Sequence, residues 1–488
     1  MKTIVCCGLL AATALSTAIA QARTDRPDAP RLRVSDNRSH LVRADGTPFV
    51  WIGDTAWELF HRLDREEAAH YLQRRAAQGF TVIQAVVLAE LDGLRTPNAY
   101  GDVPLIDLDP TKPNENYFKH VDWIVDEAER KGLYVGMLPT WGDKLFSLHP
   151  AAGPIVFNPQ NAHAYGRLLG ARYREKPIIW ILGGDRNVDS PEVLEIWRAM
   201  ARGLREGDGG SHLISFHPRG ESSSSETLHN EPWLDFNMYQ SGHARRPMAV
   251  HRFAAHEALL HPRKPFVDAE PAYEDIPIAF WEFIDWSNPR RVPAGVLDDR
   301  GLIADRGHFA KGYFDAHDVR VHAYWNFLSG ACGYTYGNNA VWQMYRAGHD
   351  ITIPCLYEWR ESLERPGAQQ MQHVRALFES HSLARLIPDQ SLVYGPNPEG
   401  PDHVRAAGST DRSFALLYLP RGKPVSVVLG KTAGEELVTR WYDPRTGDYT
   451  APQTRANSGI AQFVPPDEGA GRDWVLVLRQ PEVSVSPP

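Results

Sequence analysis

The stretch Ile178-Ile179-Trp180-Ile181-Leu182-Gly183-Gly184-Asp185 contains five consecutive apolar residues, followed by two glycines and an acid. An apolar run of this length without alternation is typical of a parallel strand that is buried on both faces. The two glycines allow the backbone to turn tightly after the strand. Asp185 then stands at the carboxyl end of the strand, which is where the active sites of parallel α/β barrels lie.

Similar apolar runs precede and follow this one, and segments with helical spacing lie between several of them. About eight strand–helix units over roughly 300 residues predict a (β/α)8 TIM barrel. A doubly wound open sheet is the structural alternative, but no G-x-G-x-x-G motif follows an early strand, which disfavours its nucleotide-binding version. The expected strands are residues 49–54, 81–88, 133–138, 178–182, 213–216, 234–238, 265–269 and 323–328, the last leading into 333–337, and the expected helices are 65–78, 117–131, 162–174 and 191–205.

The sequence pattern changes near Pro388. Helical spacing ends there, and short β-type segments follow, separated by turn motifs such as Asp443-Pro444-Arg445-Thr446-Gly447. This pattern predicts a small antiparallel β-sandwich. We therefore expect a catalytic barrel over residues 31–387 and a C-terminal β-sandwich over residues 388–480. The expected sandwich strands are residues 413–419, 425–429, 437–442 and 474–478.

The first 22 residues have the pattern of a secretory signal peptide. Lys2 precedes a mostly apolar run that ends in small residues, as Ala18-Ile19-Ala20 or Ala20-Gln21-Ala22. A membrane anchor is the weaker interpretation, because hydroxyl residues interrupt the run and no stop-transfer flank follows. We expect a secreted or periplasmic protein with no stable membrane anchor. Removal of the signal leaves Cys332 and Cys355, for which one disulfide and two buried thiols are both compatible with the sequence.

The overall composition narrows the classes of partner. Lys and Arg number 52 and Asp and Glu number 60, so the formal net charge is −8, which argues against nucleic acid as a partner. The 14 tryptophans suit a cleft for sugars, although a large core would also use them. No H-x-x-x-H or similar cluster occurs, so we expect neither a metal nor another cofactor. The sequence does not specify an oligomeric state.

Two carboxylates occupy matching positions in the expected barrel. Asp185 follows the fourth run, and Glu270 follows the seventh within Val267-Asp268-Ala269-Glu270-Pro271. Strands four and seven lie on opposite sides of an eight-stranded barrel, so the two acids can face each other across its mouth. Glycoside hydrolysis needs one carboxyl group that donates a proton and one that is ionised. The structural alternative is that each acid caps a helix or pairs with an arginine, as Asp185 could with Arg186.

Other polar and aromatic residues at the strand ends are candidates for binding a sugar. Each also has a structural interpretation: an acid can cap a helix, a histidine can belong to a loop, and a tryptophan can belong to the core. Lys144, His243 and Glu274 share these strand ends. The predicted substrate-binding residues are Asp54, Trp57, Gln84, Trp141, Asp143, Asn187, His217, Tyr239, Gln240, Tyr273 and Tyr336.

Four motifs lie at the ends of the expected strands. They are Gly53-Asp54-Thr55-Ala56-Trp57, Trp180-Ile181-Leu182-Gly183-Gly184-Asp185, Asp268-Ala269-Glu270-Pro271-Ala272-Tyr273-Glu274, and Gly333-Tyr334-Thr335-Tyr336-Gly337 with Val341-Trp342-Gln343. Together these motifs resemble the apiosidase-like glycoside hydrolases, which are glycoside hydrolase family 140 and its DUF4038 relatives. The resemblance covers roughly residues 31 to 480 and implies a (β/α)8 barrel followed by a small β-sandwich that is often labelled collagen-binding.

The resemblance also implies an activity. It suggests a secreted bacterial enzyme that acts on plant cell-wall pectin and releases chains linked through apiose in rhamnogalacturonan-II. The catalytic Asp of the family matches Asp185 and its catalytic Glu matches Glu270, the same pair that the strand pattern selects. Many barrel glycosidases carry Asn-Glu after strand four, whereas this chain has Gly184-Asp185.

The working hypothesis is a glycoside hydrolase in which Asp185 is the general acid/base and Glu270 the nucleophile. A retaining outcome is favoured, for which the carboxyl groups would lie about 5–5.5 Å apart, against roughly 6.5–9.5 Å for inversion. One alternative is a non-catalytic polysaccharide- or matrix-binding protein. Another is a glycosidase of the same fold that acts on a different sugar.

Overall fold

The computed structural model describes residues 31–146 and 153–481. The signal peptide expected over residues 1–22 lies outside these ranges, so export stays a prediction. Within the described residues, no helix combines the length and the apolar character that crossing a bilayer requires. Cys332 and Cys355 are both buried free thiols, which decides between the two alternatives that the sequence left open.

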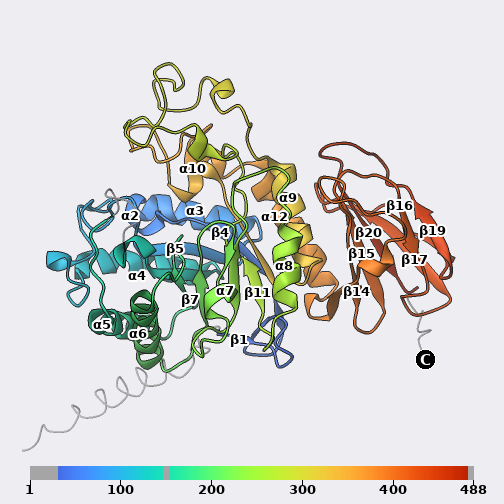
Figure 1. Cartoon of the computed structure of the whole chain (residues 1–488), viewed down its shortest axis with the longest axis horizontal. Helices are drawn as coiled ribbons and strands as arrows, with labels where there is room; N and C mark the ends of the chain where they lie inside the picture. The colour runs from blue at the N-terminus through green and yellow to red at the C-terminus, as the bar shows by residue number, and fades with distance from the viewer. Residues whose placement is uncertain (1–30, 147–152, 482–488) are drawn as a thin grey trace, which may run out of the picture.

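A nine-stranded sheet forms the barrel within the described residues, and eight of its strands run parallel. Hydrogen bonds from Asp235 N to Ile214 O (2.9 Å) and from Ser215 Oγ to Phe236 O (2.7 Å) join the two ends of the parallel series. This arrangement confirms the predicted TIM-barrel fold (Figure 1). The parallel strands, in sheet order, are β8 (Ile214–His217), β7 (Ile178–Gly183), β6 (Tyr134–Thr140), β5 (Val82–Leu88), β4 (Trp51–Thr55), β12 (Gly333–Tyr336), β11 (Phe266–Asp268) and β10 (Asn237–Gln240), and β9 (Ser222–Ser223) pairs antiparallel with β10.

Helices surround this sheet. Their starts follow the sequence: Asp64 and Glu67 form a capping box on α3, and Ser190 caps α6 with Pro191 at its first position. The long helices are α3 (Arg65–Ala77), α4 (Glu115–Arg130), α5 (Pro159–Arg172), α6 (Pro191–Asp208), α8 (Val250–Ala258), α9 (Ala316–Phe327) and α12 (Pro366–Ser380). Short helices are α2 (Leu59–Arg62), α7 (Ser225–Leu228), α10 (Asn339–Trp342) and α11 (Trp359–Ser362), with 3-10 turns η1 (Ile106–Leu108), η2 (Gly142–Lys144), η3 (Phe280–Glu282), η4 (Arg306–His308), η5 (Leu383–Arg385) and η6 (Gln390–Leu392).

One expected strand is wrong. Residues 323–328 belong to α9 and its C-terminal cap, and the eighth strand is β12, which begins at Gly333. Every residue of α9 from Val319 to Phe327 is buried. A helix that is enclosed on all sides has no polar stripe, so a short apolar segment within it looks the same as a buried strand.

Two smaller parts adjoin the barrel. A three-stranded sheet of β1 (Leu32–Val34), β2 (Leu41–Arg43) and β3 (Pro48–Phe49) leads directly into β4, at the end of the barrel opposite to the strand carboxyl ends. At the carboxyl end, the loops after β11 and β12 build an extension at the top of Figure 1. Its own apolar core includes Val292, Val296, Phe309 and Leu356.

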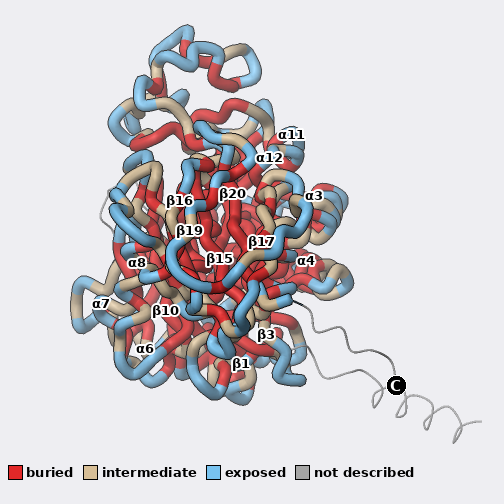
Figure 2. The backbone as a smooth tube through the Cα atoms, turned by 90° about the vertical axis from the view of Figure 1, so that its right-hand side faces the viewer, coloured by how far each residue is buried: buried red, intermediate tan, exposed pale blue. Residues whose placement is uncertain are grey.

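The C-terminal domain is a β-sandwich, as predicted. Its larger sheet has six strands within the described residues, and a two-stranded sheet of β16 (Val425–Val428) and β19 (Ile460–Phe463) covers it. Figure 2 looks onto this domain and shows β15 and β20 as buried strands within it. The larger sheet, in order, contains β13 (Leu386–Pro388), β14 (Arg405–Ser409), β15 (Phe414–Leu419), β20 (Trp474–Arg479), β17 (Glu436–Tyr442) and β18 (Gln453–Ala456).

The larger sheet is buried on both faces. Leu417 and Leu476 belong to the core that it shares with β16 and β19, whereas Leu416 and Val477 belong to the main core of the barrel. Neighbours along a strand point to opposite faces, so the sheet contributes alternate residues to two separate cores. Tyr418 stacks on Tyr324 of α9 with ring centroids 4.7 Å apart.

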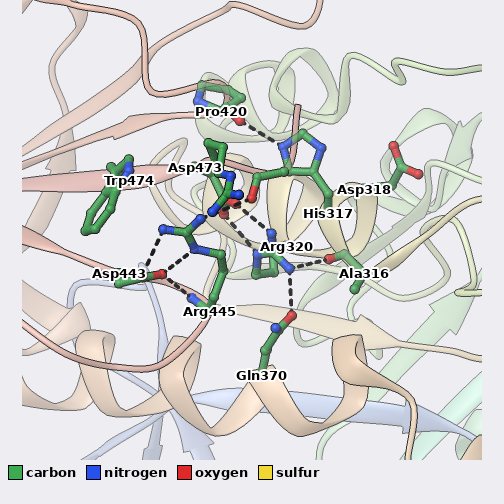
Figure 3. Close-up of polar contacts among 12 residues, drawn as sticks. Ala316, His317, Asp318, Arg320, Gln370, Pro420, Asp443, Arg445, Asp473 and Trp474 are labelled. Atoms are coloured by element: carbon green, nitrogen blue, oxygen red, sulfur yellow. Dashed lines mark hydrogen bonds and ion pairs between the residues drawn. The ribbon is translucent and has the colours of Figure 1, made fainter. Parts of the chain in front are cut away.

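A buried ion pair joins the two domains. Arg320 of α9 donates to both carboxylate oxygens of Asp473, at 2.6 and 3.0 Å, and both side chains are almost completely enclosed (Figure 3). Tyr418 OH donates to the same carboxylate at 3.0 Å, and Gln370 of α12 accepts from Arg320 at 2.6 Å. Each buried charge therefore has several partners, as burial of an ion pair requires.

Candidate active site

Asp185 follows β7 by two residues and lies on a strained turn. Gly183, Gly184 and Asp185 have φ values of 90°, 103° and 51°, and only glycine adopts such angles without cost. A Cβ on Gly183 would collide with the carbonyl oxygen of His217, and one on Gly184 would lie 2.7 Å from the ring of Trp141. The two glycines are thus needed both for the turn and for the close approach of these neighbours. Asp185 itself holds a conformation unfavourable for a residue with a side chain, a kind of strain that concentrates at active sites.

Glu270 follows β11 by two residues and is held by two histidines. Nε2 of His217 lies 3.1 Å from Oε2 of Glu270, and Nε2 of His243 lies 3.2 Å from Oε1. His217 is the last residue of β8, and His243 follows β10. Glu270 is only 7% exposed, and its backbone carbonyl accepts from Gly242 at 3.0 Å. Three neighbouring strands therefore combine to fix this carboxylate.

The two carboxyl groups are driven towards opposite protonation states. Burial acts to raise the pKa of Glu270, but the polar contacts with His217 and His243 outweigh it and lower this pKa to about 2. Desolvation and the negative charge of Glu270 together raise the pKa of Asp185, whose side chain is 44% exposed, to about 6, against the opposing effect of Arg186. A carboxyl pair with separated pKa values is what an acid and an ionised partner in one site require.

His217 contacts both acids. The backbone N–H of Asp185 donates to Nδ1 of His217 at 3.5 Å, so Nδ1 acts as the acceptor in this tautomer. The other ring nitrogen, Nε2, faces Glu270. His217 therefore contacts both acids, the backbone of Asp185 through Nδ1 and the carboxylate of Glu270 through Nε2.

Aromatic rings form the wall beside this pair. Trp57 lies 5.2 Å from Trp141 and 5.3 Å from His217, measured between ring centroids, and Tyr273 lies 4.5 Å from His243. All of these rings are nearly or fully buried. The two predicted tryptophans and Tyr273 are thus assembled around the histidines that hold Glu270, where they restrict solvent and shape the site.

Four further predicted residues support this region. Gln84 lies inside the barrel and donates to the carbonyl of Ala269 at 2.9 Å, which fixes the backbone next to Glu270. Asp143 pairs with Lys144 at 2.7 Å. Asn187 donates to Ser222 at 3.1 Å and accepts from the backbone of Arg219 at 3.1 Å. Gln240 is the last residue of β10 and is 5% exposed.

Three predicted substrate-binding residues lie elsewhere. Asp54 pairs with Arg75 of α3 at 2.6 Å and accepts from Tyr71 at 2.5 Å, with both charged groups fully buried. Tyr239 stacks on Phe253 of α8 and donates to Asn326 of α9. Tyr336 donates to Glu274 at 2.7 Å, and its ring faces Arg75.

These positions have a common cause. Asp54, Tyr239 and Tyr336 lie within their strands, and alternate residues of a strand point to opposite faces. They point outward into the helix layer, where each has a structural partner. The substrate-binding prediction for these three residues is therefore corrected.

Sequence reasoning missed Glu90. This residue follows β5 by two positions, as Glu270 follows β11. Burial raises its pKa well above the usual value, and the negative charges of Glu58, Asp185, Asp143 and Glu270 raise it further. For the second apolar run, the residue chosen was Gln84, which lies within the strand. A search beyond the end of that run would have found Glu90.

Within the described residues, one group has ligand atoms close enough to hold a metal ion, namely His251, Glu399 and His403. It lies between α8 and the C-terminal domain, and neither Asp185 nor Glu270 belongs to it. The nearby guanidinium groups of Arg252 and Arg405 oppose a further cation there.

Two family models match the chain, one over each domain. A family model described as "Apiosidase-like, catalytic domain" matches residues 35–385, and one described as "Putative collagen-binding domain of a collagenase" matches residues 387–479. No curated protein matches the chain.

Solved structures are similar over both domains. A glycoside hydrolase family 5 structure from Bacteroides vulgatus ATCC 8482 has 29% identity and a TM-score of 0.80, with 94% of each chain covered. A structure titled "Glycoside hydrolase" has 30% identity and a TM-score of 0.79, covering 93% of this chain and 98% of that one. A further glycoside hydrolase structure from Bacteroides vulgatus ATCC 8482, at 14% identity and a TM-score of 0.62, covers 93% of this chain and 83% of its own and shares the fold.

Proposed function

The chain belongs to the apiosidase-like family and is a glycoside hydrolase, and from this premise we propose that it is an exported enzyme that cleaves pectic glycans of the plant cell wall. The proposed bond is the apiose linkage through which side chains of rhamnogalacturonan-II are attached. The family match supports the type of sugar, and the sequence of residues 1–22 supports export. The substrate is an oligo- or polysaccharide.

The proposed mechanism retains the anomeric configuration. In the first step, the carboxylate of Glu270 attacks the anomeric carbon, and the carboxyl group of Asp185 gives its proton to the departing glycosidic oxygen. In the second step, Asp185 takes a proton from a water molecule, which attacks the glycosyl ester and releases the sugar and the free Glu270 carboxylate. Asp185 is protonated again at the end of the cycle.

The observation that carries this proposal is the opposite protonation of the two acids. The imidazoles of His217 and His243 keep Glu270 ionised, with a pKa of about 2, whereas Asp185 has a pKa of about 6 and holds a proton in mildly acidic solution. An ionised carboxylate can act as the nucleophile, and a carboxyl group that still carries its proton can act as the general acid.

A substrate panel tests the proposed substrate. The protein is incubated with rhamnogalacturonan-II oligosaccharides, other pectic oligosaccharides and aryl glycosides, and released sugars are identified by chromatography. We expect release of a chain ending at apiose. Hydrolysis of a different glycan alone would contradict the pectic substrate and leave the glycosidase intact.

Active-site variants test the mechanism. Glu270→Gln and Asp185→Asn should each remove most turnover without loss of fold, and the product of the native enzyme should first appear in the same anomeric form as the substrate, as followed by proton NMR. Asp185→Asn should retain more activity on a dinitrophenyl glycoside, because that leaving group needs no proton. Initial formation of the opposite anomer would replace the retaining mechanism with an inverting one.

A further inference from the structure

A cavity lies where the barrel meets the C-terminal sheet, and neither Asp185 nor Glu270 lines it. It has a volume of about 420 Å³ and opens between the end of α12 and the start of β15, β17 and the end of β20. Cavities of about this size hold small ligands in proteins. Three arginines line it, together with His381, Phe414 and Tyr449. The arginines are Arg385, Arg440 and Arg479.

The register of the sheet explains why the arginines converge. Phe414 pairs with Arg479, and Arg440 pairs with Val477, so these residues point to the same face of neighbouring strands. That face packs against the barrel through Leu416 and Val477. Beyond the end of α12, the barrel no longer covers this face of the sheet. The residues there are arginines with guanidinium groups that are partly exposed to solvent.

The cavity carries an excess of positive charge. Among the described residues that line it there is no carboxylate. Asp411, just outside, pairs with Arg385 at 2.5 Å. Arg440 donates through Nε to the carbonyl of Thr450 at 2.8 Å and lies 4.9 Å over the ring of Tyr449, and within the described part of the chain it forms no ion pair. A protein with a net charge of −8 thus presents a local cationic pocket.

The titration of a neighbouring group supports this assessment. Burial lowers the pKa of His381, and the positive charges of Arg479 and Arg385 lower it further. The imidazole is therefore neutral beside the guanidinium groups and can accept or donate a hydrogen bond.

We propose that this cavity binds the carboxylate of an acidic sugar residue. A guanidinium group matches a carboxylate with two parallel hydrogen bonds, and the half-buried side chain of Tyr449 also lines the cavity. Ser380 and Ser413 at the rim can bind sugar hydroxyls. The choice of a uronate as ligand rests on the proposed pectic substrate, whereas the cationic pocket itself does not.

Calorimetric titration of the full chain tests the site. The probe is digalacturonate, compared with the uncharged galactose disaccharide and with inorganic phosphate. We expect digalacturonate to bind with an affinity that falls as salt is added, and the uncharged sugar to bind much more weakly. Arg440→Gln should weaken digalacturonate binding about tenfold or more, because a charge-assisted contact is lost.

Arg455→Gln is the matched control. Arg455 lies on β18, with its guanidinium 4.6 Å over Phe463, and does not line the cavity. This variant should bind digalacturonate as the native protein does. Both variants should hydrolyse a small aryl glycoside at the native rate and unfold at similar temperatures, which separates this site from the active site and from misfolding.

Three results would overturn the proposal: equal affinity for charged and uncharged disaccharides, native binding by Arg440→Gln, or no binding at millimolar digalacturonate. Binding of phosphate without digalacturonate would identify a general anion site and would also contradict a sugar ligand. Failure of the enzyme to cleave pectic chains would overturn the proposed function, while digalacturonate binding that depends on Arg440 would still establish the cavity as a uronate site.

Discussion

Nε2 of His217, the last residue of β8, lies 3.1 Å from Oε2 of Glu270, which follows β11. The same imidazole accepts the backbone N–H of Asp185 through Nδ1. One histidine thus contacts both of the acids that we propose to be catalytic. The predictions below follow from this connection and from the buried ion pairs around the barrel.

Removal of the His217 contact should shift the acidic side of the pH profile. In His217→Phe, burial acts on Glu270 with less opposition, so the pKa of Glu270 should rise and kcat/KM should begin to fall at a higher pH as the solution is acidified. His217→Gln retains a donor and should shift the profile less. An unchanged acidic limb in His217→Phe, measured with a well-folded variant, would contradict the role assigned to this histidine.

The native enzyme should lose activity as the pH rises through about 6. In the proposed mechanism Asp185 carries a proton when the glycosidic bond breaks. Its pKa is about 6, so the protonated fraction declines above that value. The measurement is kcat/KM against pH with a natural oligosaccharide. A dinitrophenyl glycoside should show a flatter alkaline limb because its leaving group needs no proton, and an equally steep decline with both substrates would argue against Asp185 as the acid.

Asp54→Asn should affect stability and leave catalysis intact. Asp54 faces Arg75 in the helix layer, and loss of its charge leaves a fully buried guanidinium group without its counter-ion. Breaking a buried pair in this way typically costs about 3–5 kcal/mol. Thermal unfolding should therefore move to a lower temperature while KM stays at the native value. A raised KM with an unchanged Tm would return Asp54 to the substrate site.

Asp473→Asn should weaken the junction between the domains in a pH-dependent way. Burial acts to raise the pKa of Asp473, but Arg320 outweighs it, so this pKa lies below its usual value. The ion pair therefore contributes stability above the unfolded pKa of about 3.9 and loses it as the pH falls through the folded value. Thermal unfolding followed from neutral to acidic pH should show a larger difference between native and variant proteins at neutral pH.

A surface pair provides the control for that experiment. Arg375 and Glu379 lie one turn apart on α12 and are partly exposed, so Arg375→Gln should change the free energy of unfolding by less than about 1 kcal/mol. If Asp473→Asn were as mild as Arg375→Gln at every pH, the buried pair would have no special part in joining the domains.

The barrel, and the positions of Asp185 and Glu270 beyond the ends of its strands, could be predicted from the sequence because they depend on features with little ambiguity. Parallel strands covered on both sides produce apolar runs, and Asp185 and Glu270 lie beyond the ends of such runs. Because these strands are buried on both faces, their sequences do not alternate between apolar and polar residues. The sequence therefore does not show which residues of a strand face the barrel interior. Asp54 and Tyr336 were therefore placed in the site although they point to the helices.

Other features depend on neighbours far away in the chain. Glu270 contacts His217 at the end of β8 and His243 after β10. Nothing in the sequence around either histidine identifies Glu270 as its partner. Glu90 was missed because the run before it was searched within the strand and not beyond its end. Residues 323–328 were misassigned because α9 has no polar side.

The larger C-terminal sheet, which is enclosed on both sides, has a consequence for how this enzyme can be divided. A fragment that ends near residue 385 would expose the surface of α9 and α12 that packs against this sheet, including Tyr324, which stacks on Tyr418, and the backbone carbonyl of His373, which accepts from Tyr442. Such a fragment would be expected to self-associate. The barrel domain is therefore not expected to be stable without the C-terminal domain. Chimeras with relatives should exchange the sheet together with α9 and α12, because residues of the sheet and of both helices form one packed core.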